Sequence, residues 1–166
     1  MYKNRPVLKL KFSTFEKVIE IIVIINLILE LLLFIRYWPY LPNKVPIHYS
    51  LFGNPDSWGS KRTLFLIPLV SILLYFMFSY ISRFPHIFNY IPEITEENAE
   101  RQYRNARTLM TCLKVEVIFL LSFILYKDIY IALRKFKELG IGSIAILLII
   151  IFVTIVYFII KSIKLR

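Results

Sequence analysis

The chain has 166 residues, of which 58% are hydrophobic and 19% charged, and its net charge at pH 7 is +10. A soluble domain is about 45–50% apolar and about 25% charged, so this composition excludes a disordered protein, a coiled coil and an ordinary soluble enzyme. The charged residues lie in short clusters between long apolar segments. This pattern predicts an all-α, four-span transmembrane helix bundle that forms a single integral membrane domain over residues 1–166, with a structured loop between spans one and two.

Four apolar segments are long enough to cross a bilayer, whose hydrocarbon core of about 30 Å needs about 20 helical residues. They lie at about residues 18–38, 63–82, 109–126 and 141–160. No cleavable signal peptide is expected, because the first apolar segment is too long and no small-residue cleavage site follows it.

The third span has a short charge-free run and must include Lys114, which we expect to pair with an acid of the first span. Upstream, Thr95 followed by Glu96 and Glu97 resembles an N-cap with acids in the first turn. We therefore expect a long third helix that begins in water near Glu96 and continues into the membrane.

Polar residues inside the first span are candidates for function, because a carboxylate in the membrane is energetically expensive. Asn26 and Glu30 are four residues apart and so share one helix face. Glu30 is expected to pair with Lys114 or Arg36, to accept a hydrogen bond from the loop, or to bind a proton or ligand. Glu20 is expected to pair with Lys17 or to reach the interface.

The segment 39–61 between the first two spans is neither short nor uniformly polar. Its prolines disfavour helix, and apolar residues alternate with other residues over 45–51, the period of a short half-buried strand. A turn is expected next, with Gly53 at positive φ and Pro55 at the second turn position. Ser60 is a plausible N-cap for the second helix. The segment should fold as a compact cap on the outer face of the bundle.

This loop carries a motif over residues 41–61, Leu-Pro-x-x-Val-Pro-Ile-His-Tyr-x-x-x-Gly-x-Pro-Asp-x-Trp-Gly-Ser-Lys. The motif resembles the signature of a bacterial membrane family catalogued as domain of unknown function 1648. The module is also similar to the N-terminal part of the longer Sdp-type immunity proteins, which protect a producing cell from its own secreted toxin and can hold a repressor at the membrane. The resemblance implies a membrane helix, this loop and further helices.

The candidate binding residues are those of the motif together with the acid of the first span: His48, Gly53, Pro55, Asp56, Trp58, Gly59, Lys61 and Glu30. His48 and Asp56 could form a metal or proton site, since imidazole and carboxylate are a common ligand pair. The structural alternative has His48 bonded to a loop carbonyl and Asp56 capping the turn or pairing with Lys61. A metalloenzyme built on His48, Asp56 and Glu30 is a third hypothesis. A structural zinc site needs about four ligands, so neither a metal nor another cofactor is expected.

Lys and Arg residues bear on topology. Twelve lie on the side of the two termini and eight on the other side, which favours both termini in the cytoplasm. Arg101, Arg104 and Arg107 form a basic stripe before the third span, expected to bind headgroups or an acidic partner. Nucleic acid is not an expected partner, because the charges form no exposed basic module. The single cysteine, Cys112, is expected to be a small buried hydrophobe.

Binding rather than catalysis is the expected activity, because phosphate-binding glycine loops, nucleophile elbows and zinc-protease motifs are absent from the sequence. The specific hypothesis is an inner-membrane protein for immunity or resistance to a secreted peptide, or for signalling at the membrane. Its partners would be the lipid bilayer and a secreted peptide or another membrane protein. The alternative is a small transporter or proton-coupled component in which Glu30, Asn26 and Lys114 form a polar path.

Overall fold

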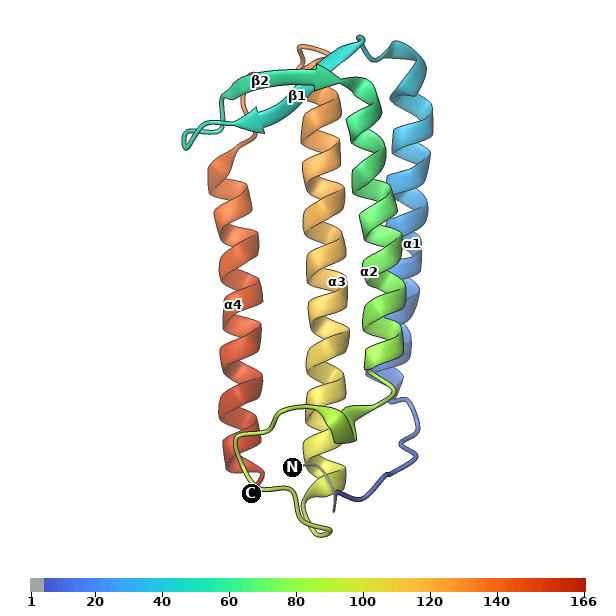
Figure 1. Ribbon diagram of the computed structural model, residues 1–166, viewed down its shortest axis with the longest axis vertical. Coiled ribbons are helices and arrows are strands. Elements are labelled where there is room, and N and C mark those ends of the chain that lie inside the picture. The colour runs from blue at the N-terminus through green and yellow to red at the C-terminus, as the bar shows by residue number, and fades with distance from the viewer. Residues whose placement is uncertain (1–4) are drawn as a thin grey trace.

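The computed structural model describes residues 5–166, and within them four long helices and a two-stranded antiparallel hairpin follow one another (Figure 1). By length and composition, each of the four helices can cross a membrane. The chain is therefore a multi-span membrane protein with the predicted four spans. The bounds are α1 Thr14–Tyr37, β1 Lys44–Tyr49, β2 Pro55–Ser60, α2 Leu66–Ile81, α3 Ala99–Ala132 and α4 Ile141–Lys164.

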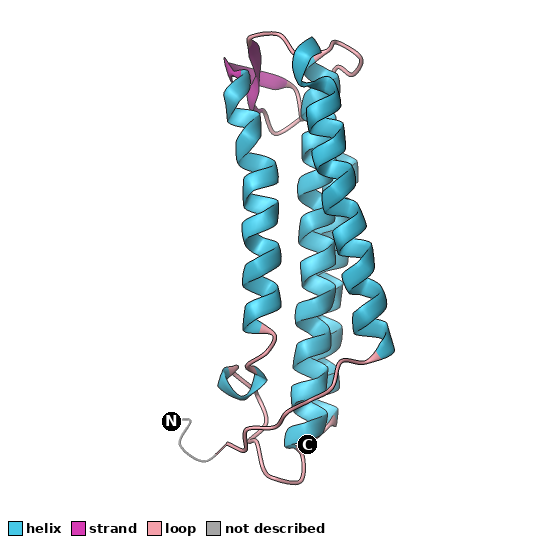
Figure 2. Cartoon of the chain, turned by 90° about the vertical axis from the view of Figure 1, so that its right-hand side faces the viewer, coloured by secondary structure: helices cyan, strands magenta, loops and turns pink. Residues whose placement is uncertain are grey.

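Helix α3 is the centre of the bundle, and α1, α2 and α4 each pack against it. Contacts between α1 and α2 are sparse, and α4 is almost wholly exposed on the faces turned away from α3. The hairpin lies across one end, and the start of α1 and the end of α4 lie at the other (Figures 1 and 2). We call the hairpin end the outer end and the opposite end the inner end.

Helix α1 begins at Thr14, before the predicted start at residue 18, because a capping box ends the preceding segment. The Ser13 hydroxyl accepts from the Glu16 backbone N–H at 3.2 Å, and the Glu16 carboxylate accepts from the Ser13 N–H at 2.7 Å. These two bonds satisfy orphan donors of the first turn. The extended segment before α1 runs across the inner end (Figure 2).

The third helix extends well beyond the predicted span of 109–126, from Ala99 to Ala132. At its start, Thr95 and Asn98 exchange hydrogen bonds between side chain and backbone N–H, so the helix begins three residues after Glu96. At its end it includes Asp128, because this buried carboxylate finds a hydrogen-bond partner in the hairpin. The expectation of one long helix is confirmed, and the helix extends past the predicted outer boundary of the span.

The hairpin is more regular than expected, because residues 55–60 form a second strand that the sequence did not indicate. In β1, Val45 is buried and Tyr49 is half-buried, as the alternation predicts, but Ile47 is 49% exposed. Register shifts between Pro46 and Tyr49 break the alternation. Ser60 does act as a cap: its hydroxyl accepts from the Arg62 N–H at the start of a short 3-10 helix that leads into α2.

The buried apolar core lies at the outer end, where the hairpin meets α1, α3 and the start of α2. Phe34 and Trp38 pack on Phe65 with ring centroids 4.7 and 4.6 Å apart, which joins α1 to the segment before α2. Further buried residues of this core are Leu41, Val45, Leu64, Leu125, Ile129 and Ala132. The hairpin is thereby seated on the bundle as a cap.

Candidate functional site: the hairpin cap and the buried carboxylates

His48 and Asp56 contact each other across the hairpin, with 2.6 Å between Nδ1 and Oδ1. Their side chains are 70% and 44% exposed, so the pair faces solvent. The structural alternative for these residues is wrong in its partners, because His48 bonds to Asp56 and Asp56 does not pair with Lys61. The exposed pair offers a hydrogen-bond donor and an acceptor to a ligand.

Lys61 closes the base of the motif loop. Its ammonium group lies 3.4 Å from the carbonyl oxygens of both Trp38 and Leu41 and 4.6 Å from the centroid of the Trp38 ring. Because it donates to the residues at which the loop leaves α1, Lys61 holds the two ends of the loop together. Lys61 therefore positions the motif loop on the bundle.

Gly53 allows the hairpin turn to contact the α3–α4 connection. Its φ is +81°, in the left-handed region that favours glycine, and its carbonyl accepts from the Leu139 N–H at 2.8 Å. A Cβ at this position would lie 3.0 Å from the Cγ1 atom of Ile141. The predicted positive φ is confirmed, and the close approach gives a second reason for glycine here.

Three further motif residues shape β2. Pro55 begins the strand opposite Tyr49, and Trp58 pairs with Pro46 and is 49% exposed. Gly59 lies under Ile47, whose side-chain carbons would be 2.9 Å from any Cβ placed there. These residues fix the hairpin shape and leave Ile47 and Trp58 partly uncovered.

Sequence reasoning missed Asp128, which it treated as a charge flanking the third span. The Tyr49 hydroxyl donates a hydrogen bond to the Asp128 carboxylate and so fastens β1 to α3. Burial, and then this hydrogen bond, raises the pKa of the Tyr49 phenol. The available signal was an acid at the end of an apolar run, where it needs a partner from another segment.

The tip of the hairpin exposes two large apolar side chains, Leu51 at 92% and Phe52 at 81%. The Gly53 N–H donates to the Ser50 carbonyl at 2.9 Å and the Ser50 N–H donates to the Asn54 carbonyl at 2.9 Å, so backbone hydrogen bonds define the tip. An apolar pair held outward on a fixed turn is suited to insertion into an apolar surface.

A second group of candidate residues lies inside the membrane span, around Glu30. This side chain is 3% exposed, and its two oxygens accept from the hydroxyls of Ser71 on α2 at 2.9 Å and Ser122 on α3 at 2.8 Å. Asn26 also donates to the Ser122 hydroxyl, at 3.0 Å. The shared face of Asn26 and Glu30 is confirmed. The expected partners Lys114 and Arg36 are wrong, because the partners within residues 5–166 are hydroxyls.

The Ser122 hydroxyl has one hydrogen but two acceptors in reach, Glu30 at 2.8 Å and the Ile118 carbonyl at 3.0 Å. If Glu30 is ionised, the hydrogen serves Glu30 and the Ile118 contact goes unused. If Glu30 is protonated on Oε2, it donates to Ser122, which then donates to Ile118. The same geometry therefore accommodates both protonation states of Glu30.

Lys114 does pair with an acid of the first span, as predicted, and that acid is Glu20. Lys114 also donates to the Ser79 hydroxyl at 3.0 Å, and the Tyr75 hydroxyl donates to Glu20 at 2.7 Å. The expected pairing of Glu20 with Lys17 is wrong. This group joins three helices on the inner side of Glu30, and among the described residues no hydrogen bond connects it to Asn26.

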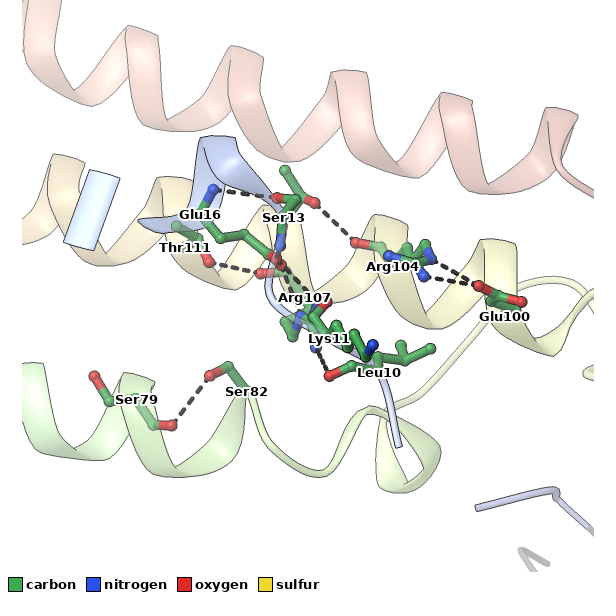
Figure 3. Close-up of polar contacts among 11 residues, drawn as sticks. Leu10, Lys11, Ser13, Glu16, Ser79, Ser82, Glu100, Arg104, Arg107 and Thr111 are labelled. Atoms are coloured by element: carbon green, nitrogen blue, oxygen red, sulfur yellow. Dashed lines mark hydrogen bonds and ion pairs between the residues drawn. The ribbon is translucent and has the colours of Figure 1, made fainter. Parts of the chain in front are cut away.

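The predicted basic stripe is not one surface. Arg107 is buried and donates to both oxygens of Glu16, at 2.7 and 2.9 Å, and to the Leu10 carbonyl (Figure 3). Arg104 instead makes an exposed ion pair with Glu100 one turn away. The headgroup interpretation is therefore wrong for Arg107, which joins α3 to the start of α1.

Cys112, expected to be buried, is half-buried.

The structure brings together His48 and Asp56 but places Glu30 inside the bundle with Ser71 and Ser122. Across residues 5–166, His, Cys, Asp and Glu side chains form no group of three that could hold a metal ion. The three members of the proposed metalloenzyme site thus do not share one location.

Comparison with protein families gives a match to part of the chain. Residues 22–72 match the family described as "Domain of unknown function (DUF1648)". The matched segment is about a third of the chain and contains Asn26, Glu30, the whole hairpin and Ser71. No curated protein and no solved structure matches the chain.

Proposed function

We propose that the protein is a binding protein of the bacterial inner membrane whose hairpin cap recognises a secreted peptide and protects the cell against it. One observation carries the proposal: Leu51 and Phe52 are exposed at the tip of a hairpin whose base is fixed to the bundle. A rigid scaffold with an exposed apolar tip binds without a large ordering cost.

The chemistry of the cap fits a peptide. The His48–Asp56 pair offers hydrogen-bonding groups next to the apolar tip, and Trp58 adds a half-exposed aromatic ring. Aromatic and apolar anchors with a few polar groups are typical of peptide-binding surfaces. The resemblance of the motif to the Sdp-type immunity module points to a secreted toxin as the peptide.

The direct test is survival. A strain from which the gene is deleted is exposed to a panel of secreted peptides, including any encoded beside the gene, and we expect sensitivity to at least one. Reintroducing the wild-type gene should restore survival, whereas Leu51→Ser with Phe52→Ser should not. Equal survival of the deletion strain across the panel would contradict the proposal.

A matched control uses two exposed isoleucines at the inner end, Ile87 and Ile91, which are 54% and 65% exposed. Replacing both by serine also removes exposed apolar area, without touching the hairpin. This variant should protect as well as wild type. If it also fails to protect, loss of apolar surface in general explains the phenotype and the hairpin assignment is wrong.

We propose that both termini face the cytoplasm, supported by the excess of Lys and Arg on their side. The count of Lys and Arg residues includes Lys3, which lies outside the described residues. In a Cys112→Ala background, a membrane-impermeant maleimide should label Asn54→Cys in intact cells. It should label Lys164→Cys only after permeabilisation. The reverse labelling pattern would overturn the orientation.

A second candidate function is proton-coupled transport, favoured by the two protonation states that the Ser122 geometry allows for Glu30. Glu30→Gln would then abolish proton-dependent flux in proteoliposomes, because glutamine keeps the hydrogen bonds but cannot exchange a proton. Unchanged flux, or no flux in wild type with any substrate tested, would favour the binding function.

A further inference from the structure

A pocket of about 460 Å³ opens at the inner end between α1 and α2, with α3 as its floor. The two helices are joined by aromatic contacts at the outer end, but they separate toward the inner end. There the residues that line the pocket come from α1, the end of α2 and α3. Its size is within the range of about 300–1,000 Å³ found for small-molecule sites.

The acids that line the pocket are already neutralised by the protein. Glu16 is held by Arg107, and Glu20 accepts from both Lys114 and Tyr75. Every oxygen of these two carboxylates therefore has a donor among the described residues. Neither acid has a free oxygen to attract a cation into the pocket.

Two cations at the mouth of the pocket remain unpaired. Lys17 near the start of α1 and Arg83 just after α2 both line the pocket and are exposed, and neither makes an ion pair within residues 5–166. Lys17 comes from α1 and Arg83 from the segment after α2, and both line the same pocket. The mouth therefore carries two positive charges that are available to an anion.

Deeper in, the pocket becomes apolar along one wall. Phe12 lies near the mouth, whereas Ile21 and Phe76 line the part closer to the middle of the bundle. Phe76 lies five residues before Ile81, the last residue of α2, which corresponds to about 8 Å along a helix. A ligand that fills the pocket must be anionic at the mouth and apolar toward the membrane interior.

We infer that this pocket binds an anionic phospholipid, with its phosphate between Lys17 and Arg83 and an acyl chain along Ile21 and Phe76. A lipid meets both requirements at once, because its headgroup lies at the depth of the helix ends and its chain in the hydrocarbon region. The lining residues come from the start of α1, the end of α2 and α3, and the start of α1 and the end of α2 lie at the end of the bundle opposite the hairpin (Figure 1).

The test measures lipid binding by native mass spectrometry of the detergent-purified protein. Dioleoyl phosphatidylglycerol and dioleoyl phosphatidylcholine have identical chains and differ in net charge. We expect one tightly bound phosphatidylglycerol and no comparable phosphatidylcholine. Lys17→Gln with Arg83→Gln should weaken phosphatidylglycerol binding about 30-fold, as expected for two interfacial cations.

A matched control removes two cations of the same membrane side, Lys161 and Lys164 at the end of α4, which are exposed and lie outside the pocket. This variant should bind phosphatidylglycerol as wild type does. A charge-neutral variant, Ile21→Trp, places bulk in the apolar part of the pocket and should also weaken binding, because Ile21 is exposed and its replacement leaves the core intact.

Three results would overturn the inference. Equal binding of the two lipids would show that the mouth does not select an anion. An equal loss in the α4 control variant would show a general surface-charge effect. Competition by glycerol phosphate at the concentration of the lipid would identify a soluble phosphate as the ligand.

Discussion

The Tyr49 hydroxyl donates a hydrogen bond to the carboxylate of Asp128, a residue 79 positions further along the chain. This bond joins a strand outside the membrane to the outer end of the central helix. Together with the bond from the Leu139 N–H to the Gly53 carbonyl, it couples the hairpin to α3 and to the connection that follows it. The candidate binding surface is thus rigidly placed.

Tyr49→Phe should lower the free energy of unfolding by about 1–3 kcal/mol, because it leaves a buried acceptor without its donor. The matched control is Tyr157→Phe on α4. Tyr157 is 57% exposed, and its hydroxyl has no hydrogen-bond partner within residues 5–166. Thermal unfolding in detergent gives both values. Equal melting temperatures for the two variants would contradict the role of the bond.

The contribution of Tyr49 should also depend on pH. Burial and the Asp128 hydrogen bond raise the pKa of Tyr49 above its ordinary value, so folding favours the neutral phenol. Its stabilisation is then fully present below the unfolded pKa of about 10 and declines as the pH rises above it. The difference in melting temperature between wild type and Tyr49→Phe, followed from pH 7 upward, should shrink only in the alkaline range. A difference that vanishes near neutral pH would disagree with this.

Arg107→Ala should be among the most damaging substitutions. It leaves the buried Glu16 carboxylate without its counter-ion, and breaking one side of a buried pair costs about 3–5 kcal/mol. Arg104→Ala removes an exposed pair with Glu100 on the same helix and should cost about 0.5 kcal/mol or less. Unfolding experiments on both variants should separate them clearly; similar small losses would mean that the buried pair contributes little.

Gly53→Ala should destabilise the cap. The φ of +81° disfavours a side chain, and the new Cβ would press on Ile141, so a loss of at least about 1 kcal/mol is expected. Gly142→Ala is the control, since a Cβ there meets nothing within 4 Å and alanine favours helix by up to about 1 kcal/mol. The two alanines should therefore shift the melting temperature in opposite directions. A gain in stability at Gly53 would show that the turn tolerates another φ.

Glu30→Gln should leave the bundle stable, because the amide can accept from Ser71 and donate to Ser122 in place of a protonated carboxyl. Ser71→Ala should instead cost about 1–3 kcal/mol by leaving a buried oxygen unpaired. Infrared difference spectra across a pH change should show a carboxyl carbonyl band in wild type that is absent in Glu30→Gln. If Glu30→Gln unfolds as readily as Ser71→Ala, the neutral form does not fit this site.

The sequence predicted the four helices well, because hydropathy over about 20 residues is a direct consequence of the membrane. It also located the informative loop and the positive φ of Gly53. It missed β2, because Pro55–Ser60 has no alternating apolar pattern and becomes a strand only by pairing with β1.

Partner choice was the weaker part of the prediction. The sequence favoured Lys17 as the partner of Glu20 and Arg36 or Lys114 as the partner of Glu30. The structure pairs Glu20 with Lys114 and Glu30 with two serines. Serines in a membrane helix give no sequence signal of what they face. In the sequence, Arg107 is one of three similar arginines. Only the fold of the segment before α1 shows that Arg107 is buried.

Helix α3 has 34 residues, which corresponds to about 50 Å at 1.5 Å per residue, against a hydrocarbon core of about 30 Å. The excess length projects into water. Hydrogen bonds hold the helix near both ends: Tyr49 bonds to Asp128 near the outer end, and Gln102 donates to the Ser162 carbonyl near the inner end. A continuous helix of this length is a stiff rod. If a ligand bound to the hairpin shifts or rotates α3, the movement would therefore extend to the opposite side of the membrane. No other segment would be needed to carry it.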